Sequence, residues 1–138
     1  MKKPSLGLKI ESIKEVVWGT VFIVLLSIIL ANYWIGFYLT RISPLPLMPF
    51  LTYVMAAICG FAAYLFLKSV RKAFYASMAM CFLACIITAV TLSIPSYIGI
   101  VDMEVGFYLT LRVFILTFFY VFPFAIGGCF AAAFLFPD

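Results

Sequence analysis

The chain has 138 residues, of which 67% are hydrophobic and only 10% are charged, and its mean hydropathy is +1.26. Soluble domains contain about 45–50% apolar and about 25% charged residues, so this composition excludes a soluble globular protein. The sequence contains no histidine, and its five acidic residues all lie outside the long apolar runs. Most general acid–base, zinc and phosphoryl-transfer chemistry is thereby removed, and we expect neither catalysis nor a cofactor.

The first element is a basic segment over residues 1–15, which precedes the first apolar run. Leu6, Ile10 and Ile13 recur at helical spacing in it, which predicts a short amphipathic helix. We expect this helix to lie along the inner headgroups as an anchor, or to contact a lipid or a partner. Ser12 begins a Ser-x-x-Glu capping box, so a break between this segment and the first span is predicted there.

Four uncharged apolar runs follow, and each is longer than the roughly 18 residues that indicate a bilayer-spanning helix. They cover residues 16–39, 47–67, 73–94 and 113–136. At about 1.5 Å of rise per residue, each run crosses the roughly 30 Å hydrocarbon core. The sequence therefore predicts an all-α polytopic membrane protein, with residues 16–138 forming one transmembrane domain.

Lysine and arginine are distributed unevenly between the two sides of these spans. One side collects seven of them and the other side collects Arg41 and Arg112. Since flanking positive charge stays cytoplasmic, both termini are predicted inside the cell, with the chain in the inner or plasma membrane. We expect the inner residues to contact lipid headgroups: Lys2, Lys3, Lys9, Lys14, Lys68, Arg71 and Lys72.

The net charge of +4 is explained by this topology, so nucleic-acid binding is not expected. The predicted connections 42–46 and 68–72 are short, which makes consecutive spans antiparallel neighbours. The remaining connection, 95–112, is predicted as an outer loop. These links favour an up-down-up-down bundle.

A five-residue segment occurs twice in the chain. Gly-Phe-Tyr-Leu-Thr at 36–40 recurs at 106–110, and further identities at the same offset bring the total to ten over residues 36–66. Two interpretations stay open: a tandem repeat of hairpins 1–70 and 71–138, or coincidence in a restricted composition. A true repeat would place the two halves parallel, about an axis along the membrane normal.

The two copies also predict a belt at the outer membrane boundary. Tyr38 and Tyr108 belong to it, joined by Tyr33 and Trp34. Arg41 and Arg112 follow the copies closely. They are expected to pair with Asp102 or Glu104, to bind lipid phosphate, or simply to extend to the interface.

Small residues recur along the second, third and fourth spans, where they allow helices to approach closely. We predict that they pack helices together: Ala56, Gly60, Ala63, Ala73, Ser77, Cys81, Gly128 and Ala132. The four cysteines have a second interpretation, because thiols at similar depths suit a soft metal such as Cu(I). Packing is the favoured role of Cys59, Cys81, Cys85 and Cys129, since no basic group lies at their depth.

Four charge-free spans with small-residue faces offer much packing surface and little chemistry. We therefore expect a non-catalytic structural, accessory or assembly subunit that contacts membrane lipids and other integral membrane proteins. The alternative is a small homo-oligomeric channel, carrier or lipid-handling protein.

Overall fold

The computed structural model describes the backbone of residues 6–40 and 49–137, and the side chains of residues 13–38 and 50–137. The described backbone forms four α-helices: α1 (Leu6–Thr40), α2 (Pro49–Leu67), α3 (Val70–Tyr97) and α4 (Met103–Leu135). Each contains a stretch long and apolar enough to cross a membrane. The prediction of an all-helical, multi-pass membrane protein with four spans is confirmed at this level.

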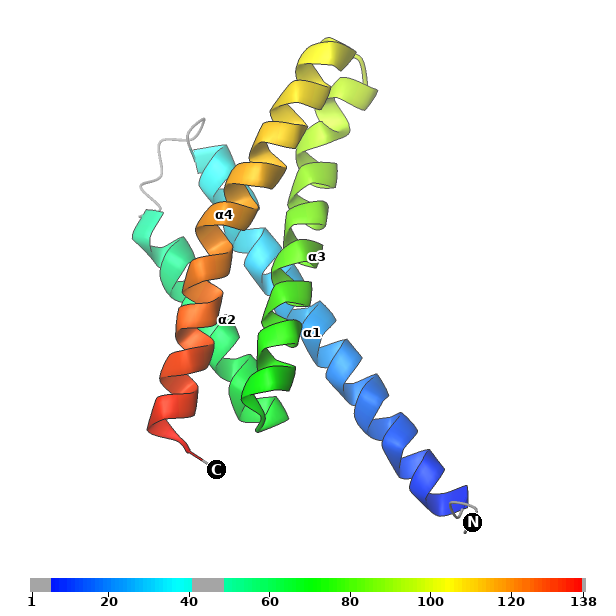
Figure 1. Ribbon diagram of the computed structural model, residues 1–138. Helices are drawn as coiled ribbons and strands as arrows, with labels where there is room; N and C mark the ends of the chain where they lie inside the picture. Colours follow the sequence, from blue (N-terminus) through cyan, green and yellow to red (C-terminus); the bar gives the residue numbers. More distant parts are fainter. Residues whose placement is uncertain (1–5, 41–48, 138) are drawn as a thin grey trace.

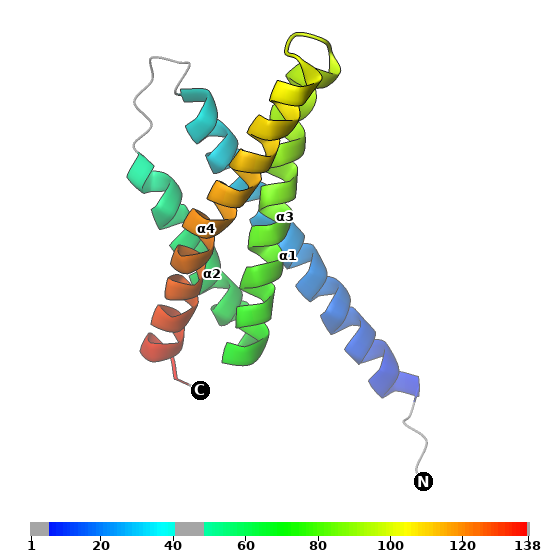
Figure 2. The ribbon, with the colours of Figure 1, turned by 45° about the horizontal axis from the view of Figure 1, so that its top comes forward.

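The helices alternate in direction, and α4 lies beside both α2 and α3 (Figure 1). The first helix is arranged differently. It crosses behind the others at a steep angle, and its first half leaves the bundle, as a second view also shows (Figure 2). The molecule is therefore a close-packed set of three helices with a fourth that joins it only over the second half of α1.

Side-chain burial explains where α1 joins the bundle. Leu26, Leu30 and Trp34 are buried in the main core, whereas Val17 and Val21 on the first half are exposed. The stacked rings of Phe22 and Phe66, with centroids 4.3 Å apart, are a contact between α1 and α2 near the point of divergence. The N-terminal half of α1 leads away from α2 and α3 (Figure 1).

The connection between α3 and α4, which was predicted as an outer loop, is much shorter than predicted. Most of the expected loop 95–112 is helical, because α3 continues to Tyr97 and α4 begins at Met103. Pro95 does not end α3, which continues for two more residues to Tyr97 even though a proline has no N–H to donate to the carbonyl four residues earlier. Gly99, at φ +80, provides the left-handed conformation that turns the chain between the two helices.

The predicted break near Ser12 is absent, since α1 runs without interruption from Leu6 to Thr40. The Ser-x-x-Glu pattern does not mark the start of a helix here, because α1 already begins at Leu6. The headgroup placement of the segment 1–15 stays a prediction. The side chains of Lys2, Lys3 and Lys9, with Arg41 and the connection 42–46, lie outside the described residues.

The two copies of Gly-Phe-Tyr-Leu-Thr lie in helices that run in opposite directions. Residues 36–40 end α1, whereas residues 106–110 follow the start of α4, after the chain has already turned (Figure 1). An axis along the membrane normal therefore cannot relate them. The later identities at this offset do fall in α2 and α4, which run the same way.

Candidate functional site

The small residues that were expected to pack helices are all buried between helices: Ala56, Gly60, Ala63, Ala73, Ser77, Cys81, Gly128 and Ala132. The backbones of α2 and α4 approach each other closely at two glycines. A Cβ atom added to Gly60 would overlap the carbonyl of Ala125, and one added to Gly128 would overlap the carbonyl of Ala57. These two glycines let the backbones touch, which is how helices gain packing energy in lipid.

The four cysteines are buried and unbridged. Cys59 and Cys81 belong to the main core, whereas Cys129 packs in a separate cluster with Tyr64, Ala73 and Ala132. Across the residues with described side chains, no three Cys, Asp or Glu groups come together as a metal site. The structure therefore does not bring the four thiols into the single ligand set that a soft metal would require.

Among the described side chains, five serine and threonine hydroxyls are buried, namely Ser27, Thr52, Ser77, Thr88 and Thr117. Two of them bond to their own helix, since Ser27 donates to Ile23 O at 2.7 Å and Thr88 donates to Ala84 O at 2.8 Å. Such bonds hide the hydroxyl from its neighbours. Among described side chains, the Ser77 hydroxyl and the Trp34 indole N–H are buried with no hydrogen-bond partner.

The predicted outer belt is wrong for Trp34. This side chain is 2% exposed and packs against the rings of Phe37, Tyr38 and Tyr53. Tyr38 is partly buried too, with its hydroxyl 3.4 Å from Thr117 Oγ1. Tyr108, its counterpart in the second copy of Gly-Phe-Tyr-Leu-Thr, is 68% exposed.

Arg112 is exposed on α4. Glu104 lies on the same helix, two turns earlier, and Asp102 lies just before the helix begins. Eight residues of α-helix rise about 12 Å, so Glu104 is not one of the i+3 or i+4 neighbours that commonly pair on a helix. Pairing with Asp102 or Glu104, binding to lipid phosphate and simple extension to the interface all stay predictions for Arg112.

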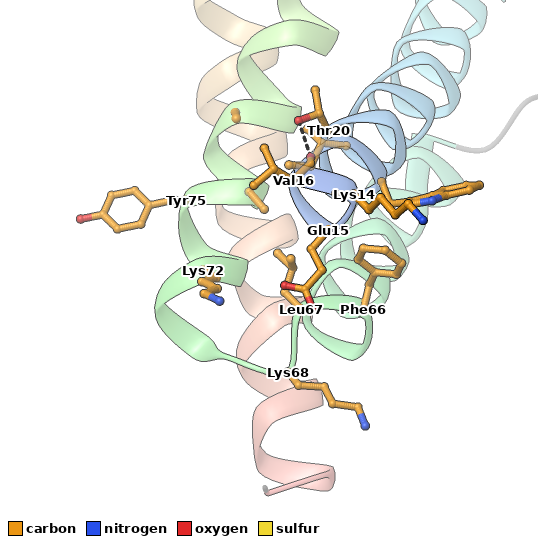
Figure 3. Close-up of a pocket in the computed structure, with 14 residues that line it drawn as sticks. Lys14, Glu15, Val16, Thr20, Phe66, Leu67, Lys68, Lys72 and Tyr75 are labelled. Carbon is orange, nitrogen blue, oxygen red and sulfur yellow. Dashed lines mark hydrogen bonds between the residues drawn. The ribbon is translucent and has the colours of Figure 1, made fainter. Parts of the chain in front are cut away.

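A groove of about 950 Å³ lies between the divergent half of α1 and the adjoining ends of α2 and α3 (Figure 3). We call it the α1 groove. Its walls are mainly apolar or small: Val16, Trp18, Gly19, Ile23, Phe66, Leu67, Tyr75, Ala76 and Ala79. Thr20 also lines it, but its hydroxyl already donates to Val16 O at 2.9 Å.

The charged residues of the α1 groove are Lys14, Glu15, Lys68 and Lys72. They come from α1, from the turn after α2 and from the first turn of α3. In Figure 3, Glu15 points from α1 toward the turn between α2 and α3, whereas Lys68 extends past that turn. Arg71 lies elsewhere, in a smaller recess of about 380 Å³ that Cys129 and Phe130 of α4 also line.

Lys68 has an uncommon backbone conformation, with φ +46 directly after the last residue of α2. Its N–H donates to Tyr64 O at 2.8 Å, which closes the helix end. Glycine is the usual residue at such a left-handed position, because a Cβ costs about 1–2 kcal/mol there.

Sequence reasoning predicted Lys14, Lys68 and Lys72 as inner lipid contacts, but it missed the groove that joins them and the role of Glu15 within it. The groove exists because α1 diverges from α3, and an apolar helix gives no signal of its angle to its neighbours. Searches against models of protein families, curated proteins and solved structures find no match to this chain.

Proposed function

We propose that the protein is a non-catalytic membrane subunit that works through helix contacts with other integral membrane proteins. The observation that carries this proposal is the chemistry of the described interior, which consists of alanines and larger aliphatic residues, cysteines, a few aromatic rings and hydroxyls. Transport of ions or polar solutes usually relies on an ionisable group facing such an interior. Here the charged side chains with a described position are exposed.

The divergent half of α1 is the surface that we assign to partner contact. Ile13, Val16, Val17 and Trp18 are all more than half exposed along it. This half-helix contributes little to the bundle, so a neighbouring helix could pack against it without disturbing the core. Gly19 adds a place of close approach, because nothing lies within 4 Å of the position its Cβ would take.

The proposal places both termini in the cytoplasm. In support, Lys14, Lys68, Arg71 and Lys72 gather near the end of the molecule where α4 finishes, whereas Arg112 lies toward the opposite end of α4. This is the asymmetry that the retention of positive charge in the cytoplasm produces.

Photo-cross-linking in the native membrane tests the proposal. Benzoylphenylalanine at position 18 on α1 should give one discrete protein adduct, and the same group at position 119 on α4 is the matched control. Trp18 is 68% exposed and Phe119 is 72% exposed, so both meet the surroundings of the bundle. Equal protein adducts at both positions, or lipid adducts alone at position 18, would contradict the assignment.

A lipid-handling role is the second candidate function, and the α1 groove is the observation that favours it. The apolar walls of this groove suit acyl chains and its basic residues suit an anionic headgroup, which are features expected of a protein that binds lipid. The test is the movement of labelled phospholipid across reconstituted vesicles. An unchanged rate relative to protein-free vesicles would remove this candidate.

A further inference from the structure

We propose that the α1 groove binds one anionic phospholipid, with an acyl chain against its apolar walls and the phosphate at the lysines of its mouth. The inference goes beyond the proposed function, since a contact subunit needs no bound lipid. The shape and the charge of the groove favour a membrane lipid over a protein segment as its occupant.

The shape of the groove suits an acyl chain. About 950 Å³ is at the upper end of the volumes of sites for small ligands, and apolar side chains dominate the lining. The walls come from α1 on one side and α3 on the other, joined by Phe66 and Leu67 of α2. A flexible chain can follow such a wedge, whereas a rigid helix about 10 Å wide fills only its open part.

The charge at the mouth favours an anion. Three lysines and one glutamate line the groove, which gives a formal excess of two positive charges. Lys72 lies in the first turn of α3, and the preceding Ser69 makes no side-chain hydrogen bond to cap that helix. The free N–H groups and positive dipole end of α3 therefore add to the attraction that Lys72 exerts on a phosphate.

The conformation of Lys68 is independent support for a role of its charge. At φ +46, glycine would be more stable, yet the chain places a cation there, at the end of α2 and beside the groove. Residues that hold an unfavourable backbone conformation cluster at binding sites. A phosphate at the mouth explains why a lysine is used.

The negative charge of Glu15 should repel the phosphate, so its removal tests whether charge at the mouth controls lipid binding. Its carboxylate points toward the turn between α2 and α3, into the same mouth (Figure 3). Like charges repel, so Glu15→Gln should strengthen the binding of an anionic lipid.

Native mass spectrometry of the delipidated full-length protein tests the proposal. Dioleoyl phosphatidylglycerol and dioleoyl phosphatidylcholine, which share their acyl chains, are added separately and in competition. We expect one phosphatidylglycerol per chain, held in preference to phosphatidylcholine. Equal retention of the two lipids would overturn the assignment of the charged mouth.

Three substitutions locate the bound lipid. Lys72→Gln should weaken phosphatidylglycerol binding about fivefold, which is the effect of one basic residue near an anionic headgroup. Arg71→Gln removes the same charge from the neighbouring position but faces the other recess, so its effect should stay below twofold. Glu15→Gln should tighten binding by a similar factor of about two to five.

A fourth variant separates binding from folding. Lys68→Gly should raise the unfolding midpoint, because glycine relieves the left-handed backbone, and should still weaken lipid binding. Equal losses for Lys72→Gln and Arg71→Gln would overturn the proposal, as would a chain dimer that forms only in place of the bound lipid.

Discussion

Two adjacent glycines in α4 have opposite surroundings, which makes them a sensitive probe of the packing between α2 and α4. Gly128 faces the backbone of α2 at Ala57, whereas nothing lies within 4 Å of the Cβ position of Gly127. Gly128→Ala should destabilise the protein by about 1–3 kcal/mol, because the two helices must separate. Unfolding in mixed micelles by titration with sodium dodecyl sulfate measures this change.

Gly127→Ala is the control for that substitution. It adds the same methyl group next to it and should be neutral, or stabilising by up to about 1 kcal/mol through helix propensity. Comparable losses for the two variants would mean that α2 and α4 do not meet at Gly128.

The two tryptophans of the chain both lie on α1, and they test the corrected position of Trp34. This side chain is 2% exposed, whereas Trp18 is 68% exposed. Trp34→Ala should cost about 1–3 kcal/mol, at or below the usual range for a large core residue, because lipid rather than water surrounds the unfolded helix. Trp18→Ala should change stability by less than about 0.5 kcal/mol.

A reversed order of these effects, measured by the same micelle titration, would restore Trp34 to the outer membrane boundary. Trp34 also shows why that boundary was hard to predict. Tryptophan is favoured both at interfaces and in cores, and only the crossing angle of α1 decides which environment position 34 meets.

At the scale of the elements, the start of α4 is the clearest departure from the predicted spans. Hydrogen exchange should find residues 106–112 protected, because their N–H groups bond within α4 from Gly106 onward. Residues 98–102 form the turn and should exchange fast. Rapid exchange through residue 112 would return this segment to the predicted outer loop.

The sequence predicted the helices more reliably than their ends and angles. Uncharged runs locate the spans because lipid forbids charge and requires an internally bonded backbone. The prediction began the fourth span after Arg112, because a charged residue usually marks the edge of the hydrocarbon core. The helix itself begins earlier, at Met103, since a helix can continue beyond that core when its sequence permits. The prediction began the loop at Pro95, since proline usually interrupts a helix, but α3 continues for two residues beyond it.

The candidate site was predictable residue by residue but not as a site. Charge asymmetry singled out Lys14, Lys68 and Lys72, and small size singled out Gly60 and Gly128. Their relations in space depend on how α1 crosses the other helices, and neither hydropathy nor spacing encodes that angle. Glu15 had no signal beyond its place in a capping box.

At the scale of the whole molecule, the described interior is held together by close packing of small residues, and α1 is only partly included. A bundle of this kind is suited to act through the surfaces that it leaves open: the divergent half of α1 for a partner and the α1 groove for a lipid. The two proposals share Val16, Trp18 and Gly19, which lie on the exposed half of α1 and also line the groove, so they are separated by their readouts: a protein adduct at position 18 for the first and retained phosphatidylglycerol for the second.

The mass of the particle that mild detergent extracts from native membranes tests the contact proposal most directly. We predict a complex in which the chain is present in a fixed ratio with at least one other integral membrane protein, and this ratio should persist through size-exclusion chromatography. A particle that contains a single copy of the chain with lipid and detergent alone would contradict the account.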